Sequence, residues 1–290
     1  MQIFLCISGY LYGQKNAGEI VAFYGKRFVK ILVPYYIVFL IAGILEVIFF
    51  RNAFSISRFV AGLVCRTRIA GGEHLWFVPI ILFCYVLTPI LDAYRDKYAK
   101  SAQILWIGAL LAVVTVSIFG GLFADFFNPA WLSCYVIGYA LGVNEDKKFI
   151  RINILLCLFG FLAIIGNGIQ IYFDYVRRIT LSGFMGTAYQ YFQNYNHVWL
   201  GDFLFLLMKT LFDRIDFSKH ENVLRLLSIT DKYSYETYLV HQFLILGPFS
   251  LMALTPILPL NIIVILIGIV LLALILKRME AIIINKWFCC

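Results

Sequence analysis

Histidine is the residue type in this sequence best suited to proton transfer near neutral pH, because its imidazole ring ionises close to that pH. Two of the four histidines are candidates, and each stands within or beside a long apolar segment. His241 lies inside the stretch SYETYLVHQFLILG, residues 234–247, and His74 opens the stretch HLWFVPIILFCYVLTPIL, residues 74–91. An imidazole in such a place could take a proton from a reacting hydroxyl. His241 could equally bond two helices together, and His74 could be an interfacial residue beside Trp76.

Cations are the second group that could do chemistry. Lys26, Arg27 and Lys30 lie in FYGKRFVKILVPYY, residues 23–36, directly before an apolar segment. We expect Pro34 in the first helical turn of that segment, where proline is tolerated. The cations could mark the cytoplasmic end of a membrane helix, or they could bind the phosphates of a cytoplasmic cofactor.

A further group of arginines lies in the segment Arg51–Glu73, and its members are Arg51, Arg58, Arg66 and Arg68. Arginine forms bidentate pairs with phosphate and carboxylate groups, so this segment could hold an anionic group. Chance accounts for the pattern equally well. Glu46, near the end of the preceding apolar segment, is assigned no role.

The elements that position these residues are long apolar segments. Hydrophobic residues make up 62% of the 290 residues and charged residues only 14%, with a mean hydropathy of +0.87. Soluble domains average about 45–50% apolar and about 25% charged residues, so this composition predicts an integral membrane protein. A membrane-spanning helix needs about 20 mostly apolar residues. The segments that satisfy or approach this length are Ile31–Phe50, His74–Leu91, Gln103–Phe123, Pro129–Val143, Ile152–Phe173, Asn196–Phe212, Tyr233–Ala253 and Ile257–Leu276.

The predicted fold is therefore an all-α, polytopic membrane bundle with eight full spans, forming a single domain over residues 1–290. A partial span at Met1–Gly13 precedes them. This segment is too short to cross a bilayer, and it lacks the basic start and the cleavage site of a signal peptide. It resembles the second half of a helix.

The basic residues predict the orientation of these spans. When the segment Gln14–Lys30 is placed in the cytoplasm, 18 of the 24 Lys and Arg residues fall in cytoplasmic segments. This excess matches the positive-inside rule and puts the C-terminus in the cytoplasm. Loops that face an anionic leaflet also account for the net charge of +8, so the charge requires no nucleic-acid partner.

Most of the seven cysteines occur singly in apolar segments, where a free thiol behaves as a small hydrophobe. Their spacing predicts neither a metal site nor a disulfide framework. Cys289 and Cys290 stand together at the C-terminus and are candidates for lipidation.

Four motifs follow one another along the chain. They are FLCISGYL at 4–11, FYGKRFVKILVPYY at 23–36, HLWFVPIILFCYVLTPIL at 74–91 and YSYETYLVHQFLILGP at 233–248. Together they resemble acyltransferase family 3, whose multispanning members O-acylate bacterial surface polysaccharides and related molecules. The resemblance covers nearly the whole chain, although residues 103–217 carry no motif of their own.

The resemblance implies a helical bundle in the inner (plasma) membrane that transfers an acyl group, usually acetyl, from cytoplasmic acyl-CoA to a glycan hydroxyl. On this basis we expect Arg27 and Lys30 to bind the acyl-CoA phosphates. We expect His74 and His241 to be catalytic, with His74 near the outer face and His241 in the cytoplasmic half of the membrane. The expected partners are the lipid bilayer and a glycan or polysaccharide acceptor, and no metal is expected.

The sequence departs from the family pattern in two respects. Family members commonly have arginine at both basic positions, whereas Lys30 keeps the charge but lacks the planar bidentate group. The family also places a catalytic His and Arg on a helix before the one that ends in SGYL, and this sequence has no counterpart. We therefore expect the sequence to be N-terminally truncated, and inactive as given.

Two alternatives stay open at this point. A non-enzymatic exporter or carrier of polysaccharide or lipid would also need intramembrane histidines and an outer cationic loop. The sequence shows no internal repeat of the kind found in transporters, which counts against this alternative. The chain could also be an inactive fragment.

The orientation leads to a first prediction. Single cysteines would be introduced into a cysteine-free chain, and intact cells would be treated with a membrane-impermeant thiol reagent. A cysteine at Arg58 should react, because its segment is outside, whereas a cysteine at Lys219 should not. Labelling at Lys219 without labelling at Arg58 would overturn the orientation.

Overall fold

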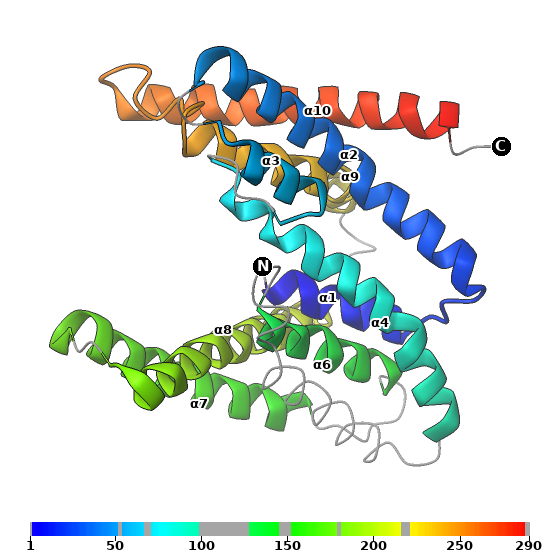
Figure 1. The fold of residues 1–290 in the computed structure, drawn as a ribbon. Helices are drawn as coiled ribbons and strands as arrows, with labels where there is room; N and C mark the ends of the chain where they lie inside the picture. Colours follow the sequence, from blue (N-terminus) through cyan, green and yellow to red (C-terminus); the bar gives the residue numbers. More distant parts are fainter. Residues whose placement is uncertain are drawn as a thin grey trace. The chain divides into compact units, whose positions relative to one another are not determined.

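The computed structural model describes residues 2–51, 54–66, 71–98, 128–144, 152–178, 181–215 and 221–287. Within these ranges the chain is helical and has no strand, which confirms the all-α prediction there (Figure 1). The helices are α1 (Gln2–Gly13), α2 (Ile20–Phe49), α3 (Ile56–Leu63), the 3-10 helix η1 (Glu73–Trp76), α4 (Phe77–Tyr98), the 3-10 helix η3 (Pro129–Trp131), α6 (Leu132–Val143), α7 (Ile152–Ile171), the π-helix η5 (Tyr172–Arg177), α8 (Gly183–Phe212), α9 (Glu221–Ile245) and α10 (Leu258–Trp287).

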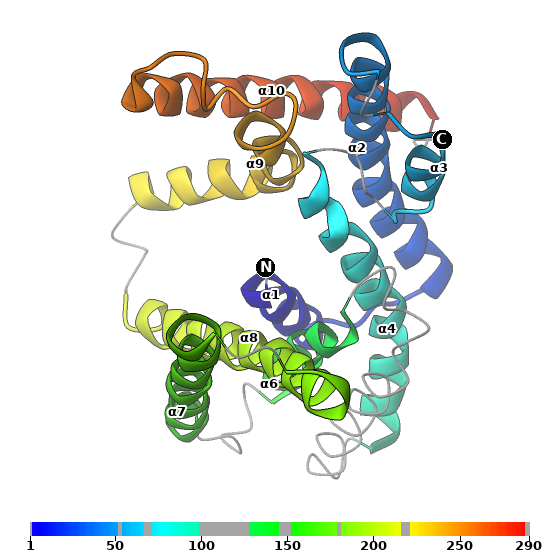
Figure 2. The ribbon, with the colours of Figure 1, turned by 60° about the vertical axis from the view of Figure 1, so that its left-hand side comes forward.

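The chain divides into two compact units, each made of two stretches of sequence. The first unit consists of Met1–Ile20 and Phe83–Ile215, and the second consists of Val21–Leu82 and Asp216–Cys290. In the first unit α1 packs against α6, and α7 packs against α8. In the second unit α9 packs against α10 (Figures 1 and 2).

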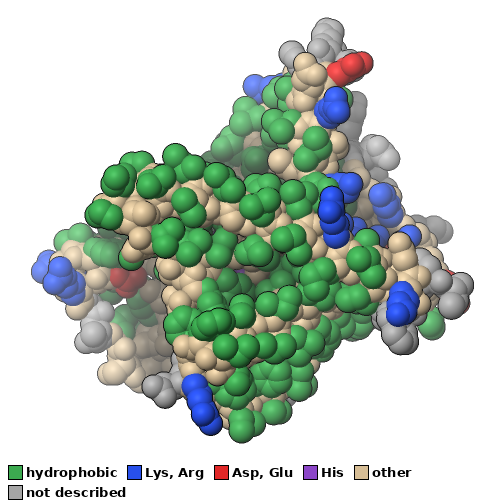
Figure 3. Space-filling view, turned by 90° about the horizontal axis from the view of Figure 1, so that it is seen from above, with side chains coloured by type: hydrophobic (Ala, Val, Ile, Leu, Met, Phe, Trp, Pro, Cys, Tyr) green, Lys and Arg blue, Asp and Glu red, His purple; other side chains and the backbone are tan. Residues whose placement is uncertain are grey.

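Several helices of the described part are long and apolar enough to cross a bilayer. They overlap the predicted spans at Ile31–Phe50, His74–Leu91, Ile152–Phe173 and Ile257–Leu276, and their bounds are Ile20–Phe49, Glu73–Lys97, Ile152–Arg177 and Leu258–Lys286. Apolar side chains also cover most of the face drawn in Figure 3, as lipid contact requires. The chain is therefore a membrane protein.

The prediction of eight full spans is not confirmed. The span predicted at Gln103–Phe123 lies outside the described residues. The span predicted at Tyr233–Ala253 has the wrong limits, because α9 already ends at Ile245. Gly247 adopts a left-handed φ of 80° and Pro248 follows it, and both features stop a helix.

Three other segments also differ from their predicted form. The segment Asn196–Phe212 is the second half of α8, which begins at Gly183 and is not among the helices apolar enough to span. The segment Pro129–Val143 forms a short apolar helix behind a 3-10 turn. Pro34 lies in the middle of α2 and not in its first turn, because that helix begins at Ile20.

The first unit depends on a close approach of α1 and α6, each of which carries two glycines spaced four residues apart. A Cβ atom at Gly9 would overlap the carbonyl oxygen of Tyr135, and one at Gly13 would overlap that of Tyr139. The facing glycines of α6, Gly138 and Gly142, meet the backbone of α1 in the same way. Only glycine lets two helices approach so closely, a pattern that favours helix association in membranes. This contact gives the glycine of the SGYL motif a packing role.

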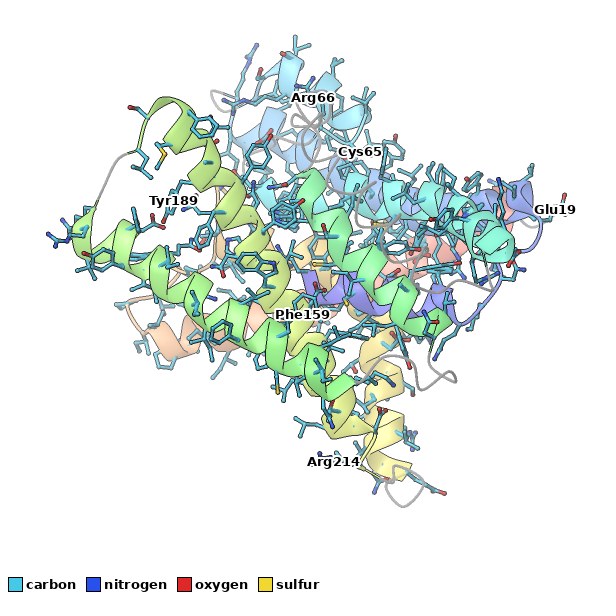
Figure 4. All side chains as sticks on the ribbon, turned by 90° about the horizontal axis from the view of Figure 1, so that it is seen from below. Glu19, Cys65, Arg66, Phe159, Tyr189 and Arg214 are labelled. Carbon is cyan, nitrogen blue, oxygen red and sulfur yellow. The ribbon has the colours of Figure 1, made fainter. Side chains whose placement is uncertain are left out.

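Polar side chains join α7 to α8 in the same unit. The Asn196 amide donates a hydrogen bond to Gln170 (2.9 Å), and its oxygen accepts one from Asn167 (3.5 Å). Nearer the start of α8, the Tyr189 hydroxyl donates to Asp174 (2.8 Å), and Figure 4 shows Tyr189 on the side of α8 that faces α7. Partial burial, with a further contribution from Asp174, raises the pKa of Tyr189 to about 12. The hydroxyl therefore stays protonated and remains a donor.

In the second unit, two neighbouring tyrosines fix α3 to α2. The Tyr35 hydroxyl donates to the carbonyl of Gly62 (2.7 Å) and the Tyr36 hydroxyl to that of Leu63 (2.8 Å). These carbonyls belong to the last turn of α3, where regular helical partners run out. The turn closes at Cys65, which adopts a left-handed φ of 61°, a conformation usually taken by glycine. Burial raises the pKa of the Cys65 thiol to about 11, so the thiol stays protonated.

The glycine contact predicts the effect of one substitution. Gly138→Ala places a Cβ on the backbone of α1 and should destabilise the protein by roughly 1–3 kcal/mol, the usual cost of overpacking. Thermal unfolding of the purified protein in detergent would measure this as a lower transition midpoint. Gly168→Ala in α7 is the matched control, because a Cβ there meets nothing within 4 Å. It should leave the midpoint unchanged or raise it slightly, since alanine favours helix. Equal midpoints for the two variants would contradict the role of Gly138.

Candidate active site

The two predicted histidines lie together in the second unit. His74 belongs to η1 and His241 to the last turns of α9, and their ring centroids are 5.1 Å apart with the ring planes at 73°. His74 is only 5% exposed, whereas His241 is half-buried. The prediction that they lie at different depths is wrong. Because α9 ends at Ile245, His241 stands near the end of its helix and at the level of η1.

A glycine turn holds η1 against the end of α9. Gly71 adopts a φ of 77°, which glycine takes readily and other residues do not. A Cβ atom at Gly71 would come within 2.9 Å of the carbonyl oxygen of Leu246, the residue directly after α9. The close contact therefore needs a glycine at this point. It places His74, three residues further on, beside His241.

Backbone carbonyls fix the tautomer of both imidazoles. His74 Nε2 lies 3.2 Å from the carbonyl oxygen of Leu239, and His241 Nδ1 lies 2.7 Å from that of Tyr238. A carbonyl oxygen only accepts, so each of these nitrogens carries the proton and donates it. The neutral rings then keep their lone pairs on His74 Nδ1 and His241 Nε2. His74 Nδ1 is buried and has no hydrogen-bond partner in the described part of the chain. Each ring thus keeps one unprotonated nitrogen, and that of His74 is buried.

Tyrosines of the same motif connect this pair to α2. Tyr235, Tyr238 and His241 are spaced three residues apart and lie along one side of α9. The Tyr238 hydroxyl donates to the backbone carbonyl of His74, and its ring stacks on that of Tyr235 with centroids 6.3 Å apart. The Tyr235 hydroxyl in turn donates to the carbonyl of Ile31 in α2 (3.0 Å). Tyr235 and Tyr238 of the motif YSYETYLVH therefore form a row of side chains that connects α2 to the two histidines.

The predicted phosphate-binding cations lie on α2, at the far end of this row. Arg27 and Lys30 are three residues apart and share one face of the helix. Lys30 is exposed, and the Arg27 guanidinium lies 5.9 Å from the ring centroid of Phe23. Ile31, the residue that Tyr235 binds, directly follows Lys30. The predicted base and the predicted anion site thus belong to one unit.

The sequence analysis missed a buried ion-pair cluster between α9, the helix of His241, and α10. Glu236 is 2% exposed, and its Oε1 atom lies 2.8 Å from Lys277 Nζ of α10. The same ammonium lies 2.9 Å from Glu280 Oε2. A buried carboxylate is costly unless it is paired, so Lys277 stabilises both acids and ties α9 to α10. The only signal in the sequence was a glutamate inside an apolar motif.

Two buried aspartates of the first unit were also missed. Asp92 accepts a hydrogen bond from the backbone N–H of Ala17 (2.7 Å) and forms a 3.4 Å ion pair with Arg95. It thereby holds the loop between α1 and α2. Asp202 in α8 is fully buried and accepts a bond from the Cys6 thiol (3.4 Å).

The remaining predicted groups do not gather into a site. Arg51 and Arg58 are exposed and Arg66 is half-buried, while Arg68, Lys219, Cys289 and Cys290 lie outside the described residues. The five cysteines of the described part form no disulfide. Within the same ranges, no group of three His, Cys, Asp or Glu side chains could hold a metal ion.

The site thus combines long apolar helices with a contact between two imidazoles, one buried and the other half-buried. The model of acyltransferase family 3, described as an acyltransferase domain, matches residues 1–278. The chain belongs to this family, and it is accordingly a membrane acyltransferase in general type. No curated protein and no solved structure matches it.

Proposed function

We propose that this protein is a membrane O-acyltransferase. It moves an acyl group from cytoplasmic acyl-CoA to a hydroxyl of a surface polysaccharide or a related glycan, and acetyl is the acyl group that the family resemblance implies. Family membership supports acyl transfer in general. The observation that carries the proposal is the contact between His74 and His241, in which each ring keeps one basic nitrogen.

The transfer exchanges a thioester for an ester. The acceptor hydroxyl oxygen attacks the thioester carbonyl carbon, so a carbon–oxygen bond forms and the carbon–sulfur bond breaks. The hydroxyl proton moves to an imidazole nitrogen, and the leaving thiolate of coenzyme A takes up a proton. A positioned base typically contributes about 10²–10⁴-fold to the rate of such a step.

The two histidines differ in exposure, and this difference suggests their roles. His241 is the better candidate for the base, because its ring is half-buried and its Nε2 lone pair can meet a hydroxyl. His74 is almost fully buried, and we assign it the positioning of the acceptor or of the acyl group.

Arg27 and Lys30 suit the phosphates of acyl-CoA, because they present two cations on one helix face. In the predicted orientation they lie at the cytoplasmic end of α2, the side on which acyl-CoA is made. The same orientation puts the C-terminus in the cytoplasm, and we propose the inner (plasma) membrane as the location because the family resemblance implies it.

Removing Arg27 should weaken donor binding. Hydrogen bonds to charged groups contribute roughly 1.5–3 kcal/mol, so Arg27→Ala should lower the affinity for acetyl-CoA about tenfold or more. Binding of radiolabelled acetyl-CoA to the protein in nanodiscs would measure this. Arg225→Ala removes an exposed cation of α9 and should have no effect. An unchanged affinity in a folded, inserted Arg27→Ala protein would rule the assignment out.

Removing either imidazole should stop acyl transfer. His241→Ala should lower glycan O-acylation at least 100-fold if the ring is the base. A hydrogen bond that only joins two helices in a membrane averages about 0.6 kcal/mol, so its loss would change turnover little. Mass spectrometry of the glycan, in a host that lacks its own enzyme and expresses the full-length chain, would distinguish a catalytic role of His241 from a structural one.

His74→Ala should do similar harm, and His197→Ala, at an exposed position of α8, is the matched control and should leave the activity unchanged. If His241→Ala kept activity within about twofold of the wild type, at equal expression, the ring would have a structural role and not the catalytic one.

A further inference from the structure

An apolar groove lies in the second unit between α2, α9 and α10. Its volume is about 310 Å³, and every side chain that lines it is apolar. The three helices contribute side chains that include Ile37, Ala42, Leu45, Val240, Phe243 and Leu276. Such a space suits a hydrocarbon chain and offers a hydrated group no hydrogen-bond partner.

The groove adjoins the candidate active site. Phe243 lines the groove, and its ring centroid lies 5.4 Å from that of His74. Val240, another lining residue, directly precedes His241 on α9. A chain held in the groove would therefore end one side chain away from the two imidazoles.

The groove also shares α2 with the candidate phosphate site. Ile37 stands seven residues after Lys30, or about 10 Å further along the helix axis, and Leu45 stands about 12 Å beyond Ile37. The helix thus offers cations at one end and an apolar wall toward the other. A ligand that matches this order has an anionic head and a hydrocarbon tail, as a long-chain acyl-CoA does.

We propose that the groove binds the acyl chain of the donor, so that the enzyme accepts acyl groups longer than acetyl. This inference rests on the proposed function. A methylene group is close in size to a water molecule, whose share of volume is about 30 Å³, so the groove holds roughly eight to ten carbon atoms. The tail of a membrane lipid would fit the same lining, but only a tail joined to a thioester explains why the groove borders the imidazole pair.

Binding of acyl-CoA thioesters of different chain length tests the proposal. Acetyl-CoA and octanoyl-CoA would be titrated against the full chain in nanodiscs. Burying a methylene group is favourable by about 0.8 kcal/mol in the best case. Octanoyl-CoA, with six further carbons, should therefore bind at least tenfold more tightly than acetyl-CoA.

Two substitutions connect this gain to the groove. Ala42→Phe fills the groove from α2 and should weaken octanoyl-CoA binding at least tenfold, with acetyl-CoA binding within twofold of the wild type. Ile44→Phe introduces the same ring on the same helix at a position that is 57% exposed and does not line the groove, and it should change neither affinity. Phe249→Ala opens the groove instead, and should shift the preferred chain to a greater length.

The outcomes separate this inference from the proposed function. Equal binding of the two thioesters would overturn the groove assignment, while acetyl-CoA binding that depends on Arg27 would still support acyl transfer. An octanoyl preference that Ala42→Phe and Phe249→Ala leave intact would assign the gain to the bilayer, and would also overturn the inference. If neither thioester bound the wild-type protein, the proposed function itself would fail.

Discussion

The bilayer interior offers no water to hydrogen-bond polar groups, so a helical membrane protein has to satisfy the polar groups of its spans internally. The helices satisfy most backbone groups, and tyrosine hydroxyls donate to carbonyls of other elements. Tyr35 and Tyr36 do so at the end of α3, Tyr235 does so in α2, and Tyr238 does so in η1. Each of these bonds fixes one element to another. The hydroxyls that satisfy the backbone are therefore also the contacts that build the candidate site.

The hydrogen bonds to backbone carbonyls also determine which nitrogen of each imidazole can accept a proton. The carbonyls of Leu239 and Tyr238 each occupy one nitrogen of an imidazole, and so determine which nitrogen stays basic. In water either tautomer would be available, and the rings would turn freely. The two carbonyl contacts remove both freedoms. An imidazole held in this way is prepared for proton transfer before any substrate arrives, which is the general requirement for efficient acid–base catalysis.

Within the described residues the sequence predicted four long apolar helices, because a run of about 20 apolar residues in such a chain usually forms a spanning helix. It also singled out both histidines, since an imidazole in an apolar segment is unusual, and their catalytic role stays a prediction. Their contact could not be predicted, because it depends on the left-handed turn at Gly71 and on the early end of α9. The pairing of Glu236 with Lys277 was equally hidden, since each residue reads separately as a charge at the edge of a helix. The hydrophobic pattern therefore predicts the helices, whereas the candidate site depends on close contacts between segments that are distant in the sequence.

The two stretches that form the second unit leave the ribosome at different times. Val21–Leu82 is made first, and Asp216–Cys290 follows only after Phe83–Ile215 has been synthesised. At roughly 5–20 residues per second, the intervening stretch occupies translation for on the order of 10 s. During that interval the imidazole of His74 and the apolar wall of α2 sit in the membrane without α9 and α10. The candidate site is therefore complete only when α9 and α10 arrive.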